Sequence, residues 1–376
     1  MPSINLINVL DLLTRSKQQG LLLSFSDDEV RVKVPRQKPA PQELLQELKD
    51  NREQLLEYFR YYEHEFKFLG DKELDANTAH YSGLAAYAEP GKTANEHLLL
   101  LNDAGSQPLF VLPGSGGKSG GYQMLANCFN GMYTVYGLEM MGTQQGEIPL
   151  PLIPDIAAQN LRWIREIQPR GPYRFIAHSF GAYVVYEMAR QLEAAGESIS
   201  FIAILDQQLN ALPGLPDYIR PVDYVMELVR DYFESFQILS PPYPEWLAGL
   251  PEKLETLSGY EIVPYVAAFT SRHMPHAARI IEYVARLINI RVYNDTMVYH
   301  PAGMIASPVL VFKAADNEEP TGDDTLGWSA FAGTITVSFV PGNHHNIVED
   351  KSAVEIAGVI KQWSLPVVQP VGMHNV

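Results

Sequence analysis

Cysteine, basic residues and long apolar runs are scarce in this sequence of 376 residues. The single cysteine, Cys128, excludes a disulfide scaffold and a zinc site built from cysteines. His273 and His276 have no third ligand at a suitable spacing, so no metal site is expected. Acidic residues outnumber basic ones by 44 to 28, a net charge of −16 that argues against broad nucleic-acid binding.

Membrane and export signals are also missing from the pattern. The longest aliphatic run, Leu98–Leu101, is far shorter than the ~20 residues that cross a membrane. The first residues, Met-Pro-Ser-Ile-Asn, lack the basic segment and long apolar run of a signal peptide. We therefore expect a cytoplasmic protein with no membrane partner and no nucleic-acid partner.

Two regions of the chain differ in net charge and in the pattern of apolar residues. Residues 1–60 hold nine basic and nine acidic residues, so the whole net charge comes from the remainder. Their pattern predicts a helix, a β-hairpin over 21–34 and one or two further helices. Residues 63–95 have no periodic pattern and are expected to be a linker. The sequence thus predicts a small domain at 1–62 and a second domain at 96–376.

From residue 96 onward, strand and helix patterns alternate. Strands are predicted over 98–102, 108–112, 134–138, 173–177, 200–205, 307–314 and 334–340, and helices over 119–129, 154–167, 181–195 and 351–363. This α/β alternation predicts a mostly parallel sheet with helices on both faces. About 100 residues separate two of these strands, too many for a simple crossover, so a lid is expected over about 211–290. Its helices are predicted over 222–237, 251–256 and 275–288.

A serine stands at a predicted strand-to-helix turn in Phe175–Ala182, Phe-Ile-Ala-His-Ser-Phe-Gly-Ala. A tight turn of this kind holds a nucleophilic serine in a strained conformation, which requires small residues two positions to either side. Ala177 and Gly181 meet that requirement, although glycine is usual at both positions. We therefore predict that Ser179 is a nucleophile. The alternative is a serine that caps the helix beginning near Gly181.

The turn that follows the predicted strand 108–112 is rich in glycine. Backbone N–H groups at such a turn, with the N–H that follows the nucleophile, can stabilise a developing oxyanion. The candidate donors are Ser115 and Phe180. A phosphate loop is the alternative, because Gly-Lys-Ser at 117–119 resembles the end of that motif, but the motif needs glycine where the chain has Leu112.

A histidine pair, His344 and His345, follows the last predicted strand. The base of a site in the order serine, acid, histidine is expected there. His344, beside the tight Gly-Asn turn, is predicted to take the serine proton and return it to the leaving group, with His345 as the alternative. The acid that orients the imidazole is expected at a strand end, and both Asp206 and Asp316 meet this condition.

Five blocks of the chain, in this order, resemble the thioesterase domains of nonribosomal peptide and polyketide synthetases. They are Pro108–Gly117, Tyr136–Glu139, Gly171–Ala189, Ala203–Asp206 and Val340–His344. The resemblance covers about residues 96–365 and implies an α/β-hydrolase fold. In this family the acid usually follows the strand after the nucleophile helix, which favours Asp206 over Asp316. The departures are Ala177 and Pro113, which stands where the family often has histidine.

Residues 1–60 are similar to the N-terminal docking domains of hybrid peptide–polyketide synthetases of the tubulysin-synthetase type. The matching features are a predicted helix over 3–19, the hairpin and the leucine-rich helical segment that follows. Such domains bind the C-terminal tail of an upstream synthetase along the hairpin edge. Arg31, Lys33 and Arg36 suit an acidic peptide added as a further strand. The alternative is a solvated strand face.

The resemblance implies an offloading thioesterase. Ser179, activated by His344 and Asp206, would accept an acyl or peptidyl chain from the phosphopantetheine arm of an upstream carrier protein and release it by hydrolysis or cyclisation. No bound cofactor is implied. The chain has no carrier-protein serine motif, so the substrate would arrive on another protein. The alternatives are a proofreading thioesterase that clears stalled carriers, a general serine carboxylesterase and a non-catalytic adaptor.

Overall fold

The main sheet is built from the strands of the strand–helix repeats and from one antiparallel edge strand. The computed structural model describes residues 9, 12, 15–16, 21–26, 29–34, 41–61, 95–144, 147–216, 219–248, 250, 254, 257, 259–316 and 322–364. Within these residues, seven strands form the sheet in the spatial order β11 (Ile335–Val340), β10 (Val309–Ala314), β7 (Ile199–Leu205), β6 (Tyr173–His178), β4 (Gln107–Leu112), β5 (Tyr133–Leu138) and β3 (Leu98–Asn102). β3 is antiparallel to β5, and the other neighbouring pairs are parallel. The prediction of a mostly parallel sheet is confirmed.

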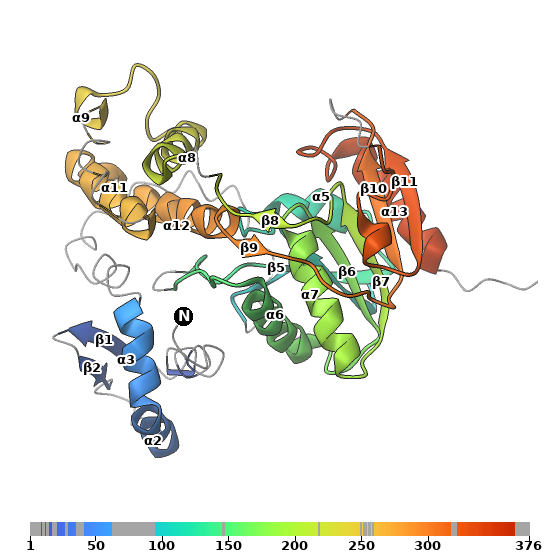
Figure 1. The fold of residues 1–376 in the computed structure, drawn as a ribbon, viewed down its shortest axis with the longest axis horizontal. Helices are drawn as coiled ribbons and strands as arrows, with labels where there is room; N and C mark the ends of the chain where they lie inside the picture. Colours follow the sequence, from blue (N-terminus) through green and yellow to red (C-terminus); the bar gives the residue numbers. More distant parts are fainter. Residues whose placement is uncertain are drawn as a thin grey trace, which may run out of the picture.

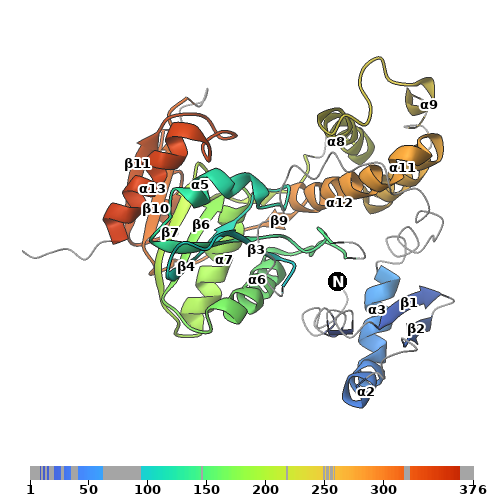
Figure 2. The same cartoon turned by 180° about the vertical axis from the view of Figure 1, so that it is seen from behind.

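Helices cover both faces of this sheet (Figures 1 and 2). On one face lie α6 (Ile153–Ile167) and α7 (Gly181–Ala194), and on the other α5 (Gln123–Asn127) and α13 (Asp350–Ser364). Alternate strand residues therefore enter different cores. On β10, Val309 and Val311 belong to the core with α6 and α7, and Leu310 and Phe312 to the core with α5 and α13. Burial on both faces explains why these strands read as continuous apolar runs.

An insertion between β7 and β10 forms the lid. Its two ends pair as a short antiparallel ladder of β8 (Leu212–Pro213) and β9 (Val298–Tyr299). Its helices are α8 (Pro221–Ser235), α9 (Glu245–Ala248), α11 (Gly259–His273) and α12 (Ala278–Asp295), with the short 3-10 turn η5 (Pro275–Ala277) before α12. Figure 1 shows them grouped beyond one end of the sheet. Their apolar side chains form a separate core, and α12 extends past the predicted lid boundary at residue 290.

One helix prediction was wrong in part, and one helix was missed. The predicted helix over 119–129 is a 3-10 turn, η4 (Gly120–Tyr122), followed by the short α5. Helix α11 was not predicted, because it begins at a glycine and contains Pro264, which interrupts helix hydrogen bonding. Ile262, Val263 and Val266 of α11 are buried in the lid core, and this packing outweighs the weak helix propensity. Most of the predicted helix over 251–256 lies outside the described residues.

The described residues of the N-terminal unit include a hairpin followed by two helices. β1 (Leu22–Ser26) and β2 (Glu29–Lys33) pair antiparallel, and α2 (Gln42–Asp50) and α3 (Arg52–Tyr61) follow. Leu44 and Leu48, one helical turn apart, bury the apolar side of α2. The predicted hairpin and helices are confirmed, whereas most of the predicted helix over 3–19 and of the linker lies outside the described residues. Across the described part of the chain, no helix combines the length and apolarity that crossing a bilayer requires.

Candidate active site

Ser179 occupies the turn between β6 and α7 with a left-handed backbone, φ 51°. A residue with a side chain rarely adopts this conformation, so the surrounding packing must hold it. Gly181 permits the close approach: a methyl group there would lie 2.7 Å from the Pro113 carbonyl oxygen and 2.8 Å from that of Leu112. The predicted need for a small residue at 181 is confirmed. Among the described residues, no side chain caps the start of α7.

We expect Gly181→Ala to lower the free energy of unfolding by about 3 kcal/mol, because the added methyl meets backbone atoms that no side-chain rotation can move. The matched control is Gly358→Ala on α13, where an added methyl meets no atom within 4 Å. Alanine favours the helix there by roughly 1 kcal/mol, so the control should be unchanged or more stable. Urea unfolding of both variants measures the difference, and equal midpoints would contradict the packing argument.

Asp206 and His344 lie in hydrogen-bond contact although 138 residues separate them in the sequence. His344 Nδ1 is 3.2 Å from Asp206 Oδ2 and 2.9 Å from the Asp206 carbonyl oxygen. Asp206 is buried, and its Oδ1 accepts a hydrogen bond of 2.8 Å from the Ala314 N–H on β10. The Asp206 hydrogen bond raises the pKa of His344, against the opposing effect of burial. Because Nδ1 faces two acceptors, it carries the proton, and Nε2 is the basic nitrogen of the neutral ring.

The other candidate acid, Asp316, supports the loop that carries the histidines. Its Oδ2 accepts a hydrogen bond of 2.9 Å from the Gly342 N–H, and its own N–H donates to the Gly342 carbonyl at 2.9 Å. His345 is exposed, and its backbone N–H donates to the Asn343 side chain at 3.0 Å. The sequence analysis left two candidates for the acid and two for the base. Of these four residues, the structure brings Asp206 and His344 together.

The predicted oxyanion donors belong to the residue that follows the serine and to the glycine-rich loop that approaches it. Within the described residues, neither the Ser115 N–H nor the Phe180 N–H donates a hydrogen bond to the protein. The two segments are close: a methyl group on Gly114 would lie 3.3 Å from Ser179 Cβ and 3.8 Å from Ser179 Oγ. Two available N–H groups beside a serine hydroxyl match the requirement for stabilising a tetrahedral oxyanion.

The lid helix α12 packs on the glycine-rich loop, a contact that the sequence analysis missed. Asn294 is buried and donates a hydrogen bond of 2.7 Å to the Ser115 carbonyl. Ile290 lies so close to Gly117 that a methyl group there would be 2.9 Å from Ile290 Cγ2. The hydroxyl of Tyr232 on α8 would lie 3.7 Å from a methyl group on Gly116. The lid thereby holds the loop that carries Ser115.

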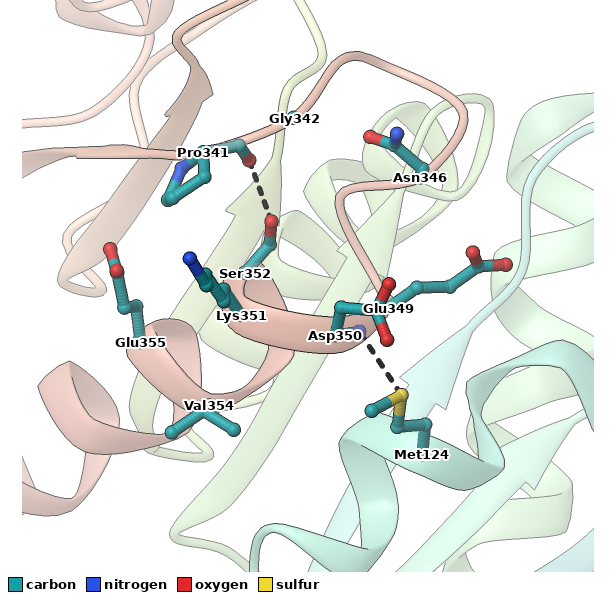
Figure 3. Close-up of a pocket in the computed structure, with 10 residues that line it drawn as sticks. All are labelled: Met124, Pro341, Gly342, Asn346, Glu349, Asp350, Lys351, Ser352, Val354 and Glu355. Atoms are coloured by element: carbon teal, nitrogen blue, oxygen red, sulfur yellow. Dashed lines mark hydrogen bonds between the residues drawn. The ribbon is translucent and has the colours of Figure 1, made fainter.

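A groove of about 760 Å³ lies on the outer side of the histidine loop (Figure 3). It runs between Met124 of α5, Pro341 and the first turns of α13. The Asp350 N–H approaches Met124 Sδ at 3.1 Å, and the Ser352 hydroxyl donates to the Pro341 carbonyl at 2.6 Å. The lining residues include neither the serine nor its neighbouring aspartate and histidine, so this groove is not where their chemistry takes place.

Two of the predicted partner-binding residues, Arg31 and Lys33, lie on the hairpin of the N-terminal unit. Arg31 lies on β2 with an exposed side chain, 3.6 Å from the Glu29 carboxylate. Lys33 ends β2 and pairs with Leu22 across the hairpin. Arg36 lies outside the described residues.

The parallel sheet, the strained serine turn and the acid–histidine contact define an α/β hydrolase. A family model for the thioesterase domain matches residues 107–364, and the chain belongs to that family. This confirms the thioesterase resemblance. The family match does not reach the N-terminal unit.

Curated relatives and solved structures agree with this family. A dimodular nonribosomal peptide synthase of Bacillus subtilis is 37% identical over 132 residues, 34% of this chain and 6% of the relative. An indigoidine synthase of Dickeya dadantii is 25% identical over 280 residues, 72% of this chain and 18% of the relative. The chain thus spans a small part of the length of these proteins.

Two solved structures share the fold at low sequence identity. A four-domain nonribosomal peptide synthetase is 22% identical with a TM-score of 0.53, covering 72% of this chain and 20% of that one. The type II thioesterase BorB, from the borrelidin biosynthetic cluster, is 18% identical with a TM-score of 0.50, covering 73% of this chain and 99% of that one. At these identities the likeness is one of fold.

Proposed function

We propose that this chain is an offloading thioesterase in nonribosomal peptide or polyketide biosynthesis, with Ser179, His344 and Asp206 as its catalytic triad. The observation that carries the proposal is the contact between the buried Asp206 carboxylate and His344 Nδ1. The His344 carbonyl is hydrogen-bonded to His178, the residue directly before the serine on the strained strand-to-helix turn. The relatives that support it are a dimodular nonribosomal peptide synthase and an indigoidine synthase.

Acyl transfer to the enzyme is the first step. His344 Nε2 takes the proton of Ser179 as Oγ attacks the thioester carbonyl carbon. The negative charge moves to the carbonyl oxygen, where the N–H groups of Ser115 and Phe180 stabilise it. The carbon–sulfur bond then breaks, His344 returns its proton to the departing thiolate, and an acyl ester on Ser179 remains.

Release is the second step, and it uses the same groups. A water molecule, or an amine or hydroxyl within the acyl chain, gives a proton to His344 Nε2 and attacks the ester carbonyl carbon. The ester bond breaks and Ser179 regains its proton from His344. Water yields a free acid, and an internal nucleophile yields a lactam or lactone. The lid sets which nucleophile reaches the ester, because it closes the site against water.

The substrate would arrive on the phosphopantetheine arm of a carrier domain in another protein, and residues 1–62 would act as the docking domain for that protein's C-terminal tail. The described hairpin is a two-stranded sheet, so each strand has an edge that can pair with a further strand. Arg31, Lys33 and Arg36 would attract an acidic tail. Docking raises the effective concentration of the carrier near Ser179.

Single-turnover transfer tests both parts of the proposal. The chain is mixed with an upstream carrier protein, acylated on its pantetheine arm, with its C-terminal tail intact or removed. We expect the intact mass of the chain to increase by the acyl group, followed by release of acid or ring. Removing the tail should slow transfer by about 10²-fold at micromolar protein, while acyl-pantetheine thioesters react equally with the full chain and with Arg31→Glu.

Three outcomes would change the proposal. No adduct and no product with any acyl thioester would contradict the thioesterase mechanism and favour the adaptor. Transfer at equal rates with and without the tail would contradict the docking domain and favour a proofreading thioesterase. Hydrolysis of simple esters at rates above those of thioesters would favour a carboxylesterase.

A further inference from the structure

A chain of hydrogen bonds connects the three loops of the site without using any reacting atom. Tyr122, the last residue of η4, is buried beneath the glycine-rich loop. Its hydroxyl accepts a hydrogen bond of 3.1 Å from the Gly114 N–H and lies 3.0 Å from His178 Nδ1. His178 Nε2 lies 2.8 Å from the His344 carbonyl oxygen.

The direction of each hydrogen bond follows from the groups at the two ends. An amide N–H can only donate and a carbonyl oxygen can only accept. His178 Nε2 therefore carries a proton and donates it to His344, and the Tyr122 hydroxyl donates to His178 Nδ1. Burial lowers the pKa of His178 to about 4, which agrees with a neutral ring that has one donor and one acceptor nitrogen.

Each end of this network lies next to a group that the proposed mechanism uses. Gly114 precedes Ser115 and lies against Ser179. His178 immediately precedes Ser179, and the carbonyl it binds belongs to His344 itself. The Gly114 N–H is bonded to Tyr122, so it is not available to the oxyanion, and Tyr122 holds the backbone directly before Ser115.

We propose that Tyr122 is a positioning residue that, acting through His178, sets the oxyanion loop and the histidine loop at their working distances from Ser179. This inference rests on the proposed function, because it assigns the network to the reactivity of Ser179. The Tyr122 hydroxyl touches no substrate atom. Its contribution is geometric, and small errors in such geometry can cost about 10²-fold in rate.

The test is Tyr122→Phe, which removes the hydroxyl and keeps the ring. Two rates are measured: labelling of Ser179 by a fluorophosphonate, and turnover of acyl-pantetheine thioesters. We expect the labelling rate and kcat to fall by about 10- to 100-fold, with KM changed by less than about twofold. The matched control is Tyr186→Phe on α7, since Tyr186 is fully buried and donates a hydrogen bond of 2.6 Å to the Gly303 carbonyl.

The control loses one buried hydrogen bond away from the network, whereas Tyr122→Phe loses two. We expect the control to lower the melting temperature and to leave both rates within about twofold of wild type. A double variant, Tyr122→Phe with His178→Phe, should lose no more than the larger single variant, because the two side chains act as one unit.

The outcomes separate this inference from the proposed function. If the fluorophosphonate labels the wild type and Tyr122→Phe reacts at the same rate, the inference about Tyr122 is overturned and the proposed function is not. Equal losses of rate in Tyr122→Phe and Tyr186→Phe, or losses that add in the double variant, also overturn it, because they reveal general destabilisation. A wild type that neither reacts with fluorophosphonate nor turns over thioesters overturns the proposed function, and the inference with it.

Discussion

Ser179→Ala should abolish acyl transfer while the protein stays folded. Removing Oγ removes the atom that forms the ester, and we expect kcat to fall by about 10⁴- to 10⁶-fold. The intact mass of the variant should show no acyl adduct with any acyl-pantetheine thioester, and thiol release should fall to the level of the buffer. Alanine keeps the backbone contacts of the turn, so the melting temperature should change little.

The control for this experiment is Ser329→Ala. Ser329 is exposed in the 3-10 turn η6 (Trp328–Ala330), and its side chain takes no part in the proposed site. It should acquire the adduct and release thiol at the wild-type rate. An adduct that persists in Ser179→Ala would place the nucleophile elsewhere and remove the main support of the mechanism.

Asp206→Asn should lower kcat by about 10⁴-fold and move the pH profile to lower pH. His344 must be neutral to accept the serine proton, so activity rises as the pH increases through its pKa. The Asp206 hydrogen bond is the main cause that raises this pKa. Without the carboxylate the pKa falls, and the residual activity should reach its plateau at a lower pH than in the wild type.

Asp316→Asn is the matched control, since it makes the same change on the neighbouring strand end. Its amide oxygen can still accept the Gly342 N–H, and the side chain is exposed, so kcat should stay within about tenfold of wild type with the pH midpoint unchanged. The reverse result, a large loss in Asp316→Asn and a small one in Asp206→Asn, would assign the acid to Asp316.

The order of the strands in the sheet explains why the sequence pattern could not decide between two carboxylates as the acid of the triad. Asp206 and Asp316 each follow a parallel strand, and both therefore lie at the same edge of the sheet. β10 lies between β11 and β7, so the strand next to the histidine loop is the one that carries Asp316. The structure has that loop crossing the end of β10, where Asp316 binds Gly342, and reaching Asp206 on the far side. Lateral strand order is not encoded in local periodicity.

Local patterns predicted the strands and the serine turn because those features depend on neighbouring residues. Short continuous apolar runs and the small Gly181 are visible in a few consecutive positions. The contact between Asn294 and Ser115 joins residues 179 positions apart, and nothing in either segment indicates the other. Helix α11 was missed for a related reason. Its stability comes from burial in the lid core, and its local sequence disfavours a helix.

The β8–β9 ladder has a consequence for how this architecture can diversify. Pairing of Leu212 with Tyr299 brings the two ends of the inserted segment together at the rim of the sheet. With its own core and adjacent ends, the segment between them can lengthen, shorten or change its interior surface without displacing β7 or β10. One scaffold can thereby be matched to acyl chains of very different size by exchanging a single cassette, provided that the exchange retains Asn294.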